Sequence, residues 1–229
     1  MRKVVAAAFV SLDGVMQAPG GPEEDPTGGF RHGGWTVHYW DDASGQAVDK
    51  LHAAPFDLLL GRRTYEIFAA HWPYVAESDP IGRLFNRATK YVASRSNPPL
   101  SWQNSVALRG EAAAAVATLK REDGPTLLIW GSGVLIQALL AEGLIDQFDL
   151  FVFPVLLGPG KRLFGERARA AGLKLVRSQA SSTGVMMSTY ERAGEVRTGS
   201  FALEQPTDAE LERRRKLKAE ASAPQRREQ

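Results

Sequence analysis

Apolar runs alternate with helix-like segments along most of the chain, and this alternation defines the predicted fold. Continuous apolar runs are typical of strands buried on both faces, and apolar residues spaced three or four apart are typical of covering helices. We predict strands over 2–12, 56–60, 89–96, 104–108, 125–130 and 146–157, and helices over 41–54, 63–72, 79–87, 110–122 and 132–143. The pattern predicts an α/β fold whose largely parallel sheet is covered on both faces.

The last part of the chain has a different pattern. Residues 172–182 and 184–194 are predicted to form an antiparallel hairpin that closes the sheet, and 195–205 are a candidate for one more strand. After them, Thr207 or Asp208 can start a helix, but 207–229 hold too few apolar residues to build a core. The sequence therefore predicts one domain over 1–194 and a partly helical or flexible extension over 195–229.

Residues 18–34, "APGGPEEDPTGGFRHGG", interrupt the alternation with a segment that is half glycine and proline. Neither a helix nor a central strand tolerates this composition, so the segment is predicted to be a long loop. Such loops are usually lids, binding loops or disordered segments. Trp35, Tyr39 and Trp40 follow the loop, and they either form an aromatic wall for a flat ring or anchor the loop to the core.

Composition and charge exclude several classes of function. The 229 residues include no cysteine, which excludes disulfides and thiolate chemistry, and the four histidines lack metal-ligand spacing, so no metal is expected. No stretch approaches the roughly 20 apolar residues of a membrane span, and the start lacks a proper signal pattern, so a cytoplasmic location is expected. The net charge of +2 comes from 208–229, and the neutral remainder argues against a nucleic-acid platform.

Three predicted strands end in polar or glycine-rich joints. "LLLGRRTYE" places Gly61, Arg62 and Thr64 at a strand–helix joint, where free N–H groups and a guanidinium suit a phosphate. "WGSGVL" brackets Ser132 with Gly131 and Gly133, a nest of N–H groups suited to a pyrophosphate. Taken singly, the first joint is better explained by a plain helix start with solvated arginines, and the second is equally explained by a tight turn.

The third joint, "YVASRS", places Ser94 and Arg95 just past another strand end. Ligands of open α/β sheets bind beyond the carboxyl ends of the strands, so three such joints together favour one dinucleotide across the sheet edge. Arginine at two of the joints favours a 2′-phosphate, and hence NADPH rather than NADH.

Two further segments have competing interpretations. Asp13, in "SLDGVM", is the carboxylate that a strand end delivers to the mouth of the sheet, unless it only forms an Asp-Gly turn. "LLGPGKRLFGE" fails as a phosphate-binding loop, because Val155 stands at the first glycine position and Arg162 follows Lys161. We interpret this segment as a glycine-rich loop after a strand.

"SLDG", "GRRTYE" and above all "WGSGVLIQALLAEGLIDQFDLFVFPVLLGPGKRLF" resemble the reductase domain at the C-terminus of the bifunctional riboflavin-biosynthesis deaminase/reductase and the stand-alone relatives of that domain. That domain has a dihydrofolate-reductase-like three-layer fold, and the resemblance spans roughly residues 1–193. It implies a homodimer, with the strand at 147–153 near the interface, and NADPH as hydride donor. It also implies that residues of all three joints bind the cofactor: Gly61, Arg62, Thr64, Ser94, Arg95, Gly131, Ser132, Gly133, Val134 and Leu135. Near the end of the first strand, it implies that Asp13 and Gly14 lie beside the nicotinamide and the substrate.

We therefore expect an NADPH-dependent reductase of a small heteroaromatic or carbonyl substrate, with a 5-amino-6-(5-phosphoribosylamino)uracil-type compound as one candidate. Asp13 is the candidate catalytic residue, and Asp13, Gly14 and Trp35 are the candidate substrate contacts. Two alternatives stay open: a non-enzymatic ligand-binding or scaffold protein on the same fold, and a dihydrofolate-reductase-like enzyme.

Overall fold

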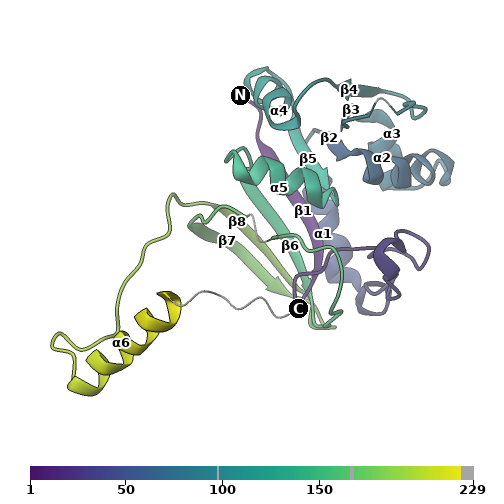
Figure 1. The fold of residues 1–229 in the computed structure, drawn as a ribbon. Coiled ribbons are helices and arrows are strands. Elements are labelled where there is room, and N and C mark those ends of the chain that lie inside the picture. Colours follow the sequence, from purple (N-terminus) through teal and green to yellow (C-terminus); the bar gives the residue numbers. More distant parts are fainter. Residues whose placement is uncertain (97, 166–167, 223–229) are drawn as a thin grey trace. The chain divides into compact units, whose positions relative to one another are not determined.

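The structure, a computed structural model, describes residues 1–96, 98–165 and 168–222 and divides into two compact units, 1–195 and 196–229. The first unit is built on one sheet of eight strands in the order β4-β3-β2-β5-β1-β6-β8-β7 (Figure 1). The pairs from β4 to β6 are parallel and those of β8 with β6 and β7 are antiparallel. The predicted α/β fold with an antiparallel closing hairpin is confirmed.

Each strand lies within or close to its predicted segment, and most are shorter. The parallel strands are β1 (Val4–Ser11), β2 (Phe56–Gly61), β3 (Lys90–Ala93), β4 (Ser105–Leu108), β5 (Thr126–Trp130) and β6 (Gln147–Phe153), and the hairpin strands are β7 (Leu173–Ala180) and β8 (Met186–Arg192). The predicted strand over 195–205 is wrong. Residues 196–205 form no strand and are all exposed, because polar residues and glycine separate the few apolar side chains of this stretch.

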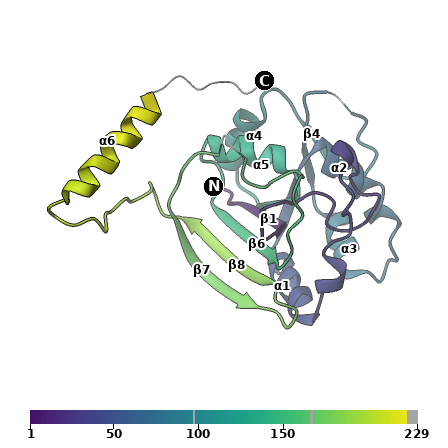
Figure 2. The same ribbon diagram turned by 60° about the horizontal axis from the view of Figure 1, so that its bottom comes forward.

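The core consists of two layers separated by the sheet. Alternate residues of β1 point to opposite faces, so Val4 and Ala6 join one apolar cluster and Val5 and Ala7 the other. The Val4 cluster includes α4 (Ala112–Arg121) and α5 (Gly133–Ala141), and the Val5 cluster includes α1 (Asp42–His52), α2 (Arg62–Ala69) and α3 (Pro80–Arg87). Figure 2 shows α4 and α5 lying together over the sheet, in agreement with the predicted three-layer arrangement.

The long loop after β1 is ordered by short turns. It contains the 3-10 turns η1 (Thr27–Gly29) and η2 (Val37–Tyr39), and a third, η3 (Trp72–Tyr74), follows α2. Gly33 lies against the backbone of Gly21 and Pro22 so closely that a Cβ there would be 2.4 Å from the Gly21 oxygen. The loop therefore folds back on itself instead of extending away from the sheet.

The second unit contains the helix α6 (Asp208–Ser222). Glu210 forms ion pairs with Arg213 and Arg214 on this helix. Its apolar residues Leu211 and Leu217 are exposed, so the helix has no core of its own among the described residues. None of the helices in the described residues is both long and apolar enough to cross a membrane.

Candidate functional site

Two helices begin without a capping side chain at the same edge of the sheet. Asp41, Asp79 and Glu111 cap α1, α3 and α4, respectively, and each side chain accepts hydrogen bonds from one or two N–H groups of the first turn. In contrast, α2 follows Gly61 at the end of β2, and α5 follows Ser132 just after β5, and neither start has a side-chain cap. Because β2 and β5 are parallel neighbours, both starts offer free N–H groups at the carboxyl edge, where an anion can bind.

A short hydrogen-bond network joins these two helix starts. The Gly61 N–H donates to Ser132 Oγ at 3.0 Å, and the Ser132 N–H donates to Thr64 Oγ1 at 3.0 Å. Gly131 has φ +57°, and a Cβ at that residue would lie 3.3 Å from Thr64 Oγ1. Glycine is therefore required here by both backbone conformation and close approach. Four predicted cofactor residues thus form one interlocked turn.

The three predicted cofactor residues at the start of α5, Gly133, Val134 and Leu135, differ in their exposure to solvent. Gly133 contacts the loop after β1, because a Cβ there would lie 2.8 Å from Met16 Sδ. Val134 is 82% exposed, whereas Leu135 is 5% exposed and belongs to the core. Leu135 can therefore contribute its backbone N–H to a ligand, but its side chain is buried in the apolar cluster that contains Val4.

The predicted adenosine-end residues form a looser group at the end of β3. Arg62 Nη1 donates to Ser96 Oγ at 3.4 Å, and the hydroxyls of Ser94 and Ser96 lie 3.2 Å apart. Arg62 also pairs with Glu66 at 3.6 Å. Arg95 is exposed beside them. Ser96 thus links two predicted residues, and its place in "SRS", two residues after Ser94, is the signal that points to it.

Asp13 is fixed in a tight turn after β1. Its carboxylate accepts from Ser11 Oγ at 2.6 Å and from the N–H groups of Leu157 and Gly158 at 3.2 and 2.9 Å. These bonds, led by the one from Ser11, lower the pKa of Asp13 to about 2. Gly14, with φ +84°, completes the turn by donating its N–H to the Ser11 carbonyl. An ionised Asp13 can position neighbouring groups and accept hydrogen bonds, but it holds no proton to donate near neutral pH.

Aromatic side chains gather beside this turn. Trp35 is 8% exposed, donates from Nε1 to the Gln17 carbonyl at 2.8 Å and packs edge-on against Phe153. It therefore anchors the loop to the core. Trp40 is 44% exposed and packs edge-on against Phe9, whose ring lies 5.3 Å from that of Trp130. Phe9 and Trp130, which the sequence reasoning did not select, lie at or near the carboxyl ends of β1 and β5.

His52 lies buried behind Trp130. Its Nε2 accepts a hydrogen bond of 3.1 Å from Trp130 Nε1, and its buried Nδ1 has no partner among the described residues. Burial lowers the pKa of His52 to about 4, against a weaker opposite effect of Asp49. The imidazole is therefore neutral at physiological pH and sets the orientation of the Trp130 ring.

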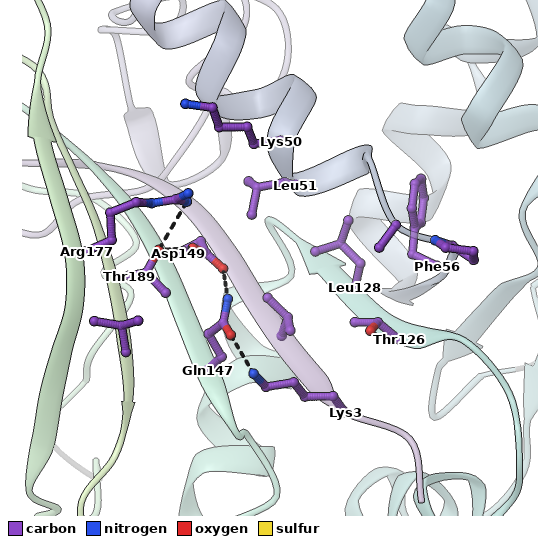
Figure 3. Close-up of a pocket in the computed structure, with 14 residues that line it drawn as sticks. Lys3, Lys50, Leu51, Phe56, Thr126, Leu128, Gln147, Asp149, Arg177 and Thr189 are labelled. Atoms are coloured by element: carbon purple, nitrogen blue, oxygen red, sulfur yellow. Dashed lines mark hydrogen bonds between the residues drawn. The ribbon is translucent and has the colours of Figure 1, made fainter.

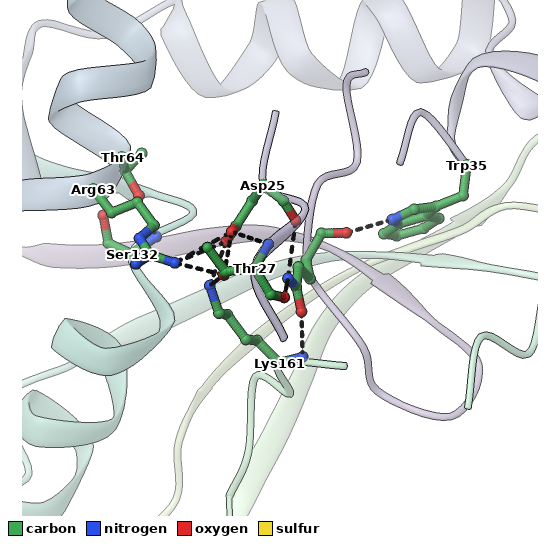
Figure 4. Close-up of polar contacts among 8 residues, drawn as sticks. Asp25, Thr27, Trp35, Arg63, Thr64, Ser132 and Lys161 are labelled. Carbon is green, nitrogen blue, oxygen red and sulfur yellow. Dashed lines mark hydrogen bonds and ion pairs between the residues drawn. The ribbon is translucent and has the colours of Figure 1, made fainter. Parts of the chain in front are cut away.

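Asp25 is the centre of a polar network that the sequence reasoning missed. Figure 4 shows Arg63, Lys161 and Thr27 directed at its carboxylate, close to Thr64 and Ser132. Asp25 lies in the glycine- and proline-rich loop, and Lys161 lies in the glycine-rich loop after β6, so no sequence spacing links them. The adjacent arginines of "GRRTYE" were the only sign of this network in the sequence. They do not reveal that Arg62 contacts Ser96 and Glu66, whereas Arg63 contacts Asp25 and Thr27.

A cavity of about 330 Å³ opens at the other end of the sheet (Figure 3). It lies at the amino ends of β1, β5 and β6, where Gln147 links Lys3 to Asp149. None of the predicted site residues lines it. Because ligands of open parallel sheets bind beyond the carboxyl ends of the strands, we place the candidate site at the carboxyl edge.

The described residues contain no cluster of three or more histidine, aspartate and glutamate side chains that could hold a metal ion. Their arrangement does fit a nicotinamide dinucleotide. Two uncapped helix starts face one edge, Gly131 leaves the space that a Cβ would fill, and Arg62 and Arg95 lie at the ends of β2 and β3. These are the features that phosphate groups require of a protein.

The fold is similar to that of dihydrofolate reductase. An Enterococcus faecalis dihydrofolate reductase, complexed with NADP(H) and RAB-propyl, aligns with a TM-score of 0.52 and 18% identity, covering 83% of this chain and 96% of that one. A protein assigned to riboflavin biosynthesis from Shewanella sp. PV-4 aligns with a TM-score of 0.56 and 20% identity, covering 83% and 99%. A pyrimidine reductase-like protein from Corynebacterium diphtheriae aligns at 0.54 and 14%, covering 85% and 93%.

Residues 2–187 match the family described as the RibD C-terminal domain, and the chain belongs to that family. Two uncharacterized proteins of Bacillus subtilis (strain 168) are similar to it. YyaP is 26% identical over 196 residues, covering 84% of this chain and 96% of its own length. YwjB is 30% identical over 176 residues, covering 76% and 89%. The family supports a reductase-type function and confirms the resemblance found in the sequence.

Proposed function

We propose that the protein is an NADPH-dependent reductase of a small heteroaromatic or carbonyl substrate. The observation that carries the proposal is the interlocked turn of Gly61, Thr64, Gly131 and Ser132, which holds two uncapped helix starts at one sheet edge. Free N–H groups at two helix starts bind a pyrophosphate without a competing side chain. The bound NADPH would supply the hydride, and the protein would supply its position.

The arginines set the preference between the two nicotinamide cofactors in this proposal. Arg62 is held near Ser96 and Glu66, and Arg95 is exposed next to Ser96, just after the end of β3. A guanidinium gains a strong, charge-assisted bond from a 2′-phosphate and little from a 2′-hydroxyl. The proposal therefore assigns Arg62 and Arg95, with Ser94, to the adenosine end of the cofactor.

At the other end, the proposal places the substrate against the aromatic side chains near β1 and β5. Phe9, Trp40 and Trp130 form a wall suited to a flat ring, and burial of Trp35 gives it a supporting role. Asp13 and Gly14 fix the turn next to this wall. Because Asp13 is ionised, any proton that the substrate takes up would have to come from water or another group.

The cofactor assignment is tested by nicotinamide fluorescence titration with NADPH and NADH. Replacing Arg62 and Arg95 with alanine should weaken NADPH binding by at least roughly tenfold and leave NADH nearly unchanged. Arg83, exposed on α3, provides the matched control, and Arg83→Ala should change neither affinity. Equal losses for both cofactors would refute the 2′-phosphate assignment, and failure of the wild-type protein to bind NADPH below about 1 mM would refute the cofactor itself.

The reductase activity is tested by following NADPH oxidation with pyrimidinone, pterin and quinone-like substrates. Turnover of a pyrimidinone bearing a ribityl or ribosyl phosphate would agree with a riboflavin-type substrate. Tight NADPH binding without turnover of any of these compounds would instead favour a ligand-binding protein on the same fold.

The proposed assembly is a homodimer. All eight residues of β7 are exposed, including the apolar residues Leu173, Leu175 and Val176 at this edge of the sheet. An exposed apolar edge strand is a natural surface for association. Light scattering after size-exclusion chromatography should give twice the chain mass of 25.0 kDa. Leu175→Lys should shift it to the monomer, and a monomeric wild-type protein would refute the proposal.

A further inference from the structure

One carboxylate in the loop between β1 and α1 contacts two cations from other parts of the first unit. Asp25 is 8% exposed, and it accepts hydrogen bonds from Arg63 Nη1 at 3.2 Å and from Lys161 Nζ. The hydroxyl of Thr27 donates to the same carboxylate at 2.5 Å. Figure 4 shows these groups converging from three separate segments on one point.

The two cations are accessible from solvent although they already have an anionic partner. Arg63 comes from the first turn of α2 and Lys161 from the loop after β6, and their side chains are 49% and 45% exposed. Each also donates to Thr27 Oγ1 at 2.8 Å. The carboxylate between them is only 9% exposed, so the cations remain reachable while their present partner is covered.

The cation pair borders the proposed pyrophosphate groove. Arg63 immediately precedes Thr64, whose hydroxyl accepts from the Ser132 N–H at the start of α5. The Arg63 guanidinium therefore projects from the same uncapped helix start that supplies free N–H groups. A carboxylate and a phosphoryl group present equivalent pairs of anionic oxygens to a guanidinium, so each can replace the other.

Asp25 is ionised where it lies. Burial by itself would raise the pKa of this carboxyl, but hydrogen bonds from Lys161 and Thr27 and the charge of Lys161 hold the pKa below its ordinary value. The carboxylate thus neutralises part of the charge of two cations, each of which also donates a hydrogen bond to the uncharged Thr27 hydroxyl. Gln17 holds the loop in this position, since its amide donates to the carbonyls of Asp25 and Thr27.

We propose that Arg63 and Lys161 form a binding subsite for a phosphoryl group, and that Asp25 occupies this subsite as an internal carboxylate until the phosphoryl group replaces it. The proposal rests on the proposed function only in taking the cofactor pyrophosphate as one source of that group. A phosphorylated substrate offers the same chemistry. In either case, binding releases the loop contact at Asp25, so ligand entry and loop position are coupled.

Calorimetric titrations of the full chain with inorganic pyrophosphate, NADPH and ribose 5-phosphate test the subsite. Asp25→Asn removes the competing charge at nearly constant shape, and it should bind the ligand about three- to tenfold more tightly. Arg63→Gln and Lys161→Gln should each weaken binding about tenfold through loss of a charged hydrogen bond. Arg83→Gln, the matched control on α3, should bind as the wild type does.

The three ligands show whether the phosphoryl group comes from the cofactor or from the substrate. They also distinguish a failure of the proposed NADPH binding from a failure of the proposed subsite. A gain for NADPH alone assigns the subsite to the cofactor, and a gain for ribose 5-phosphate alone assigns it to the substrate. If the wild-type protein binds no NADPH but pyrophosphate responds to all three variants as expected, the proposed cofactor fails and the subsite stands. If no ligand responds to Arg63→Gln and Lys161→Gln, the subsite is refuted, whatever Asp25→Asn does.

A second measurement reports the loop directly. Hydrogen exchange of the amides in residues 17–30 should increase when wild-type protein binds pyrophosphate, and Asp25→Asn should show the faster exchange without ligand. If Asp25→Asn fails to fold, as judged by circular dichroism, the half-exposed Arg63 and Lys161 decide the question, because neither contributes to the core. Slower or unchanged exchange in the wild type on binding would overturn the proposed replacement of Asp25.

Discussion

The backbone N–H of Ser132 donates a 3.0 Å hydrogen bond to the hydroxyl of Thr64, across 68 residues of sequence. This bond joins the first turn of α2 to the turn before α5. Ser132 holds the αL conformation, with φ 56°, in which few residues other than glycine or asparagine are comfortable. The Thr64 hydroxyl thus helps to hold a strained turn on which the separation of the two helix starts depends.

Thr64→Val should therefore weaken NADPH binding while preserving the shape of the side chain. Loss of one partly buried hydrogen bond typically costs about 1 kcal/mol, so the dissociation constant should rise roughly fivefold. Fluorescence titration measures the change. Thr64→Ser keeps the acceptor and should bind as the wild type does. Equal weakening in both variants would show that the methyl group beside Gly131, and not the hydroxyl, positions the turn.

Asp13→Asn should lower the rate of NADPH oxidation without changing its pH dependence. The pKa of Asp13 lies at about 2, so the carboxylate is already fully ionised throughout the working range of the assay. Its role in the structure is to accept the N–H groups of Leu157 and Gly158. Rates measured between about pH 5 and 9 should give parallel profiles for wild type and variant. Loss of an ionisation step from the variant's profile would mean that Asp13 transfers a proton.

Strand and helix order were predictable because both faces of the parallel strands are buried. Runs such as "LLL" before Gly61 and "LLI" before Trp130 indicate strands that are buried on both faces, because helical segments lie between them in the chain. The segment 195–205 misled the prediction, since Val196, Phe201 and Leu203 resemble strand residues. In the structure all three are exposed, because burial requires a neighbouring strand as well as apolar side chains.

The sequence predicted those residues of the candidate site that lie at the ends of parallel strands. It did not predict those that two loops bring together. Gly61 and Gly131 are recognisable because each stops an apolar run, and parallel strands then bring them to one edge. Asp25 and Lys161 meet through two loops whose paths depend on side-chain contacts, and no period in the sequence encodes that meeting. Trp35 illustrates the same limit, since its sequence position allowed both a substrate contact and an anchor.

His52→Phe should change the response of the protein to acid. The pKa of His52 is about 4 in the folded protein against an ordinary value of 6.5, because burial disfavours the charged imidazole. Between these values the unfolded chain binds more protons than the folded one, so stability is lost as the pH falls from 6.5 to 4. The loss attributable to His52 should be on the order of 3 kcal/mol.

Urea unfolding at about pH 7 and about pH 4.5 measures this contribution. Near neutral pH the variant should be less stable by roughly 1–2 kcal/mol, because the buried Trp130 Nε1 loses its acceptor. At the lower pH the difference should shrink or reverse, since phenylalanine takes up no proton. A difference that is the same at both pH values would mean that His52 titrates normally in the folded protein.

Gly131→Ala and Gly45→Ala should change stability in opposite directions. Gly131 has φ +57°, and its added Cβ would approach Thr64 Cγ2 and Oγ1 to 3.3 Å. The left-handed conformation alone costs a non-glycine residue about 1–2 kcal/mol, so Gly131→Ala should lower both the free energy of unfolding and the affinity for NADPH.

Gly45 lies inside α1 with nothing within 4 Å of its added Cβ. Gly45→Ala should therefore raise stability by about 0.5–1 kcal/mol and leave NADPH binding unchanged. If Gly131→Ala kept wild-type stability and affinity, the close approach of Thr64 to the turn would not matter for the proposed site.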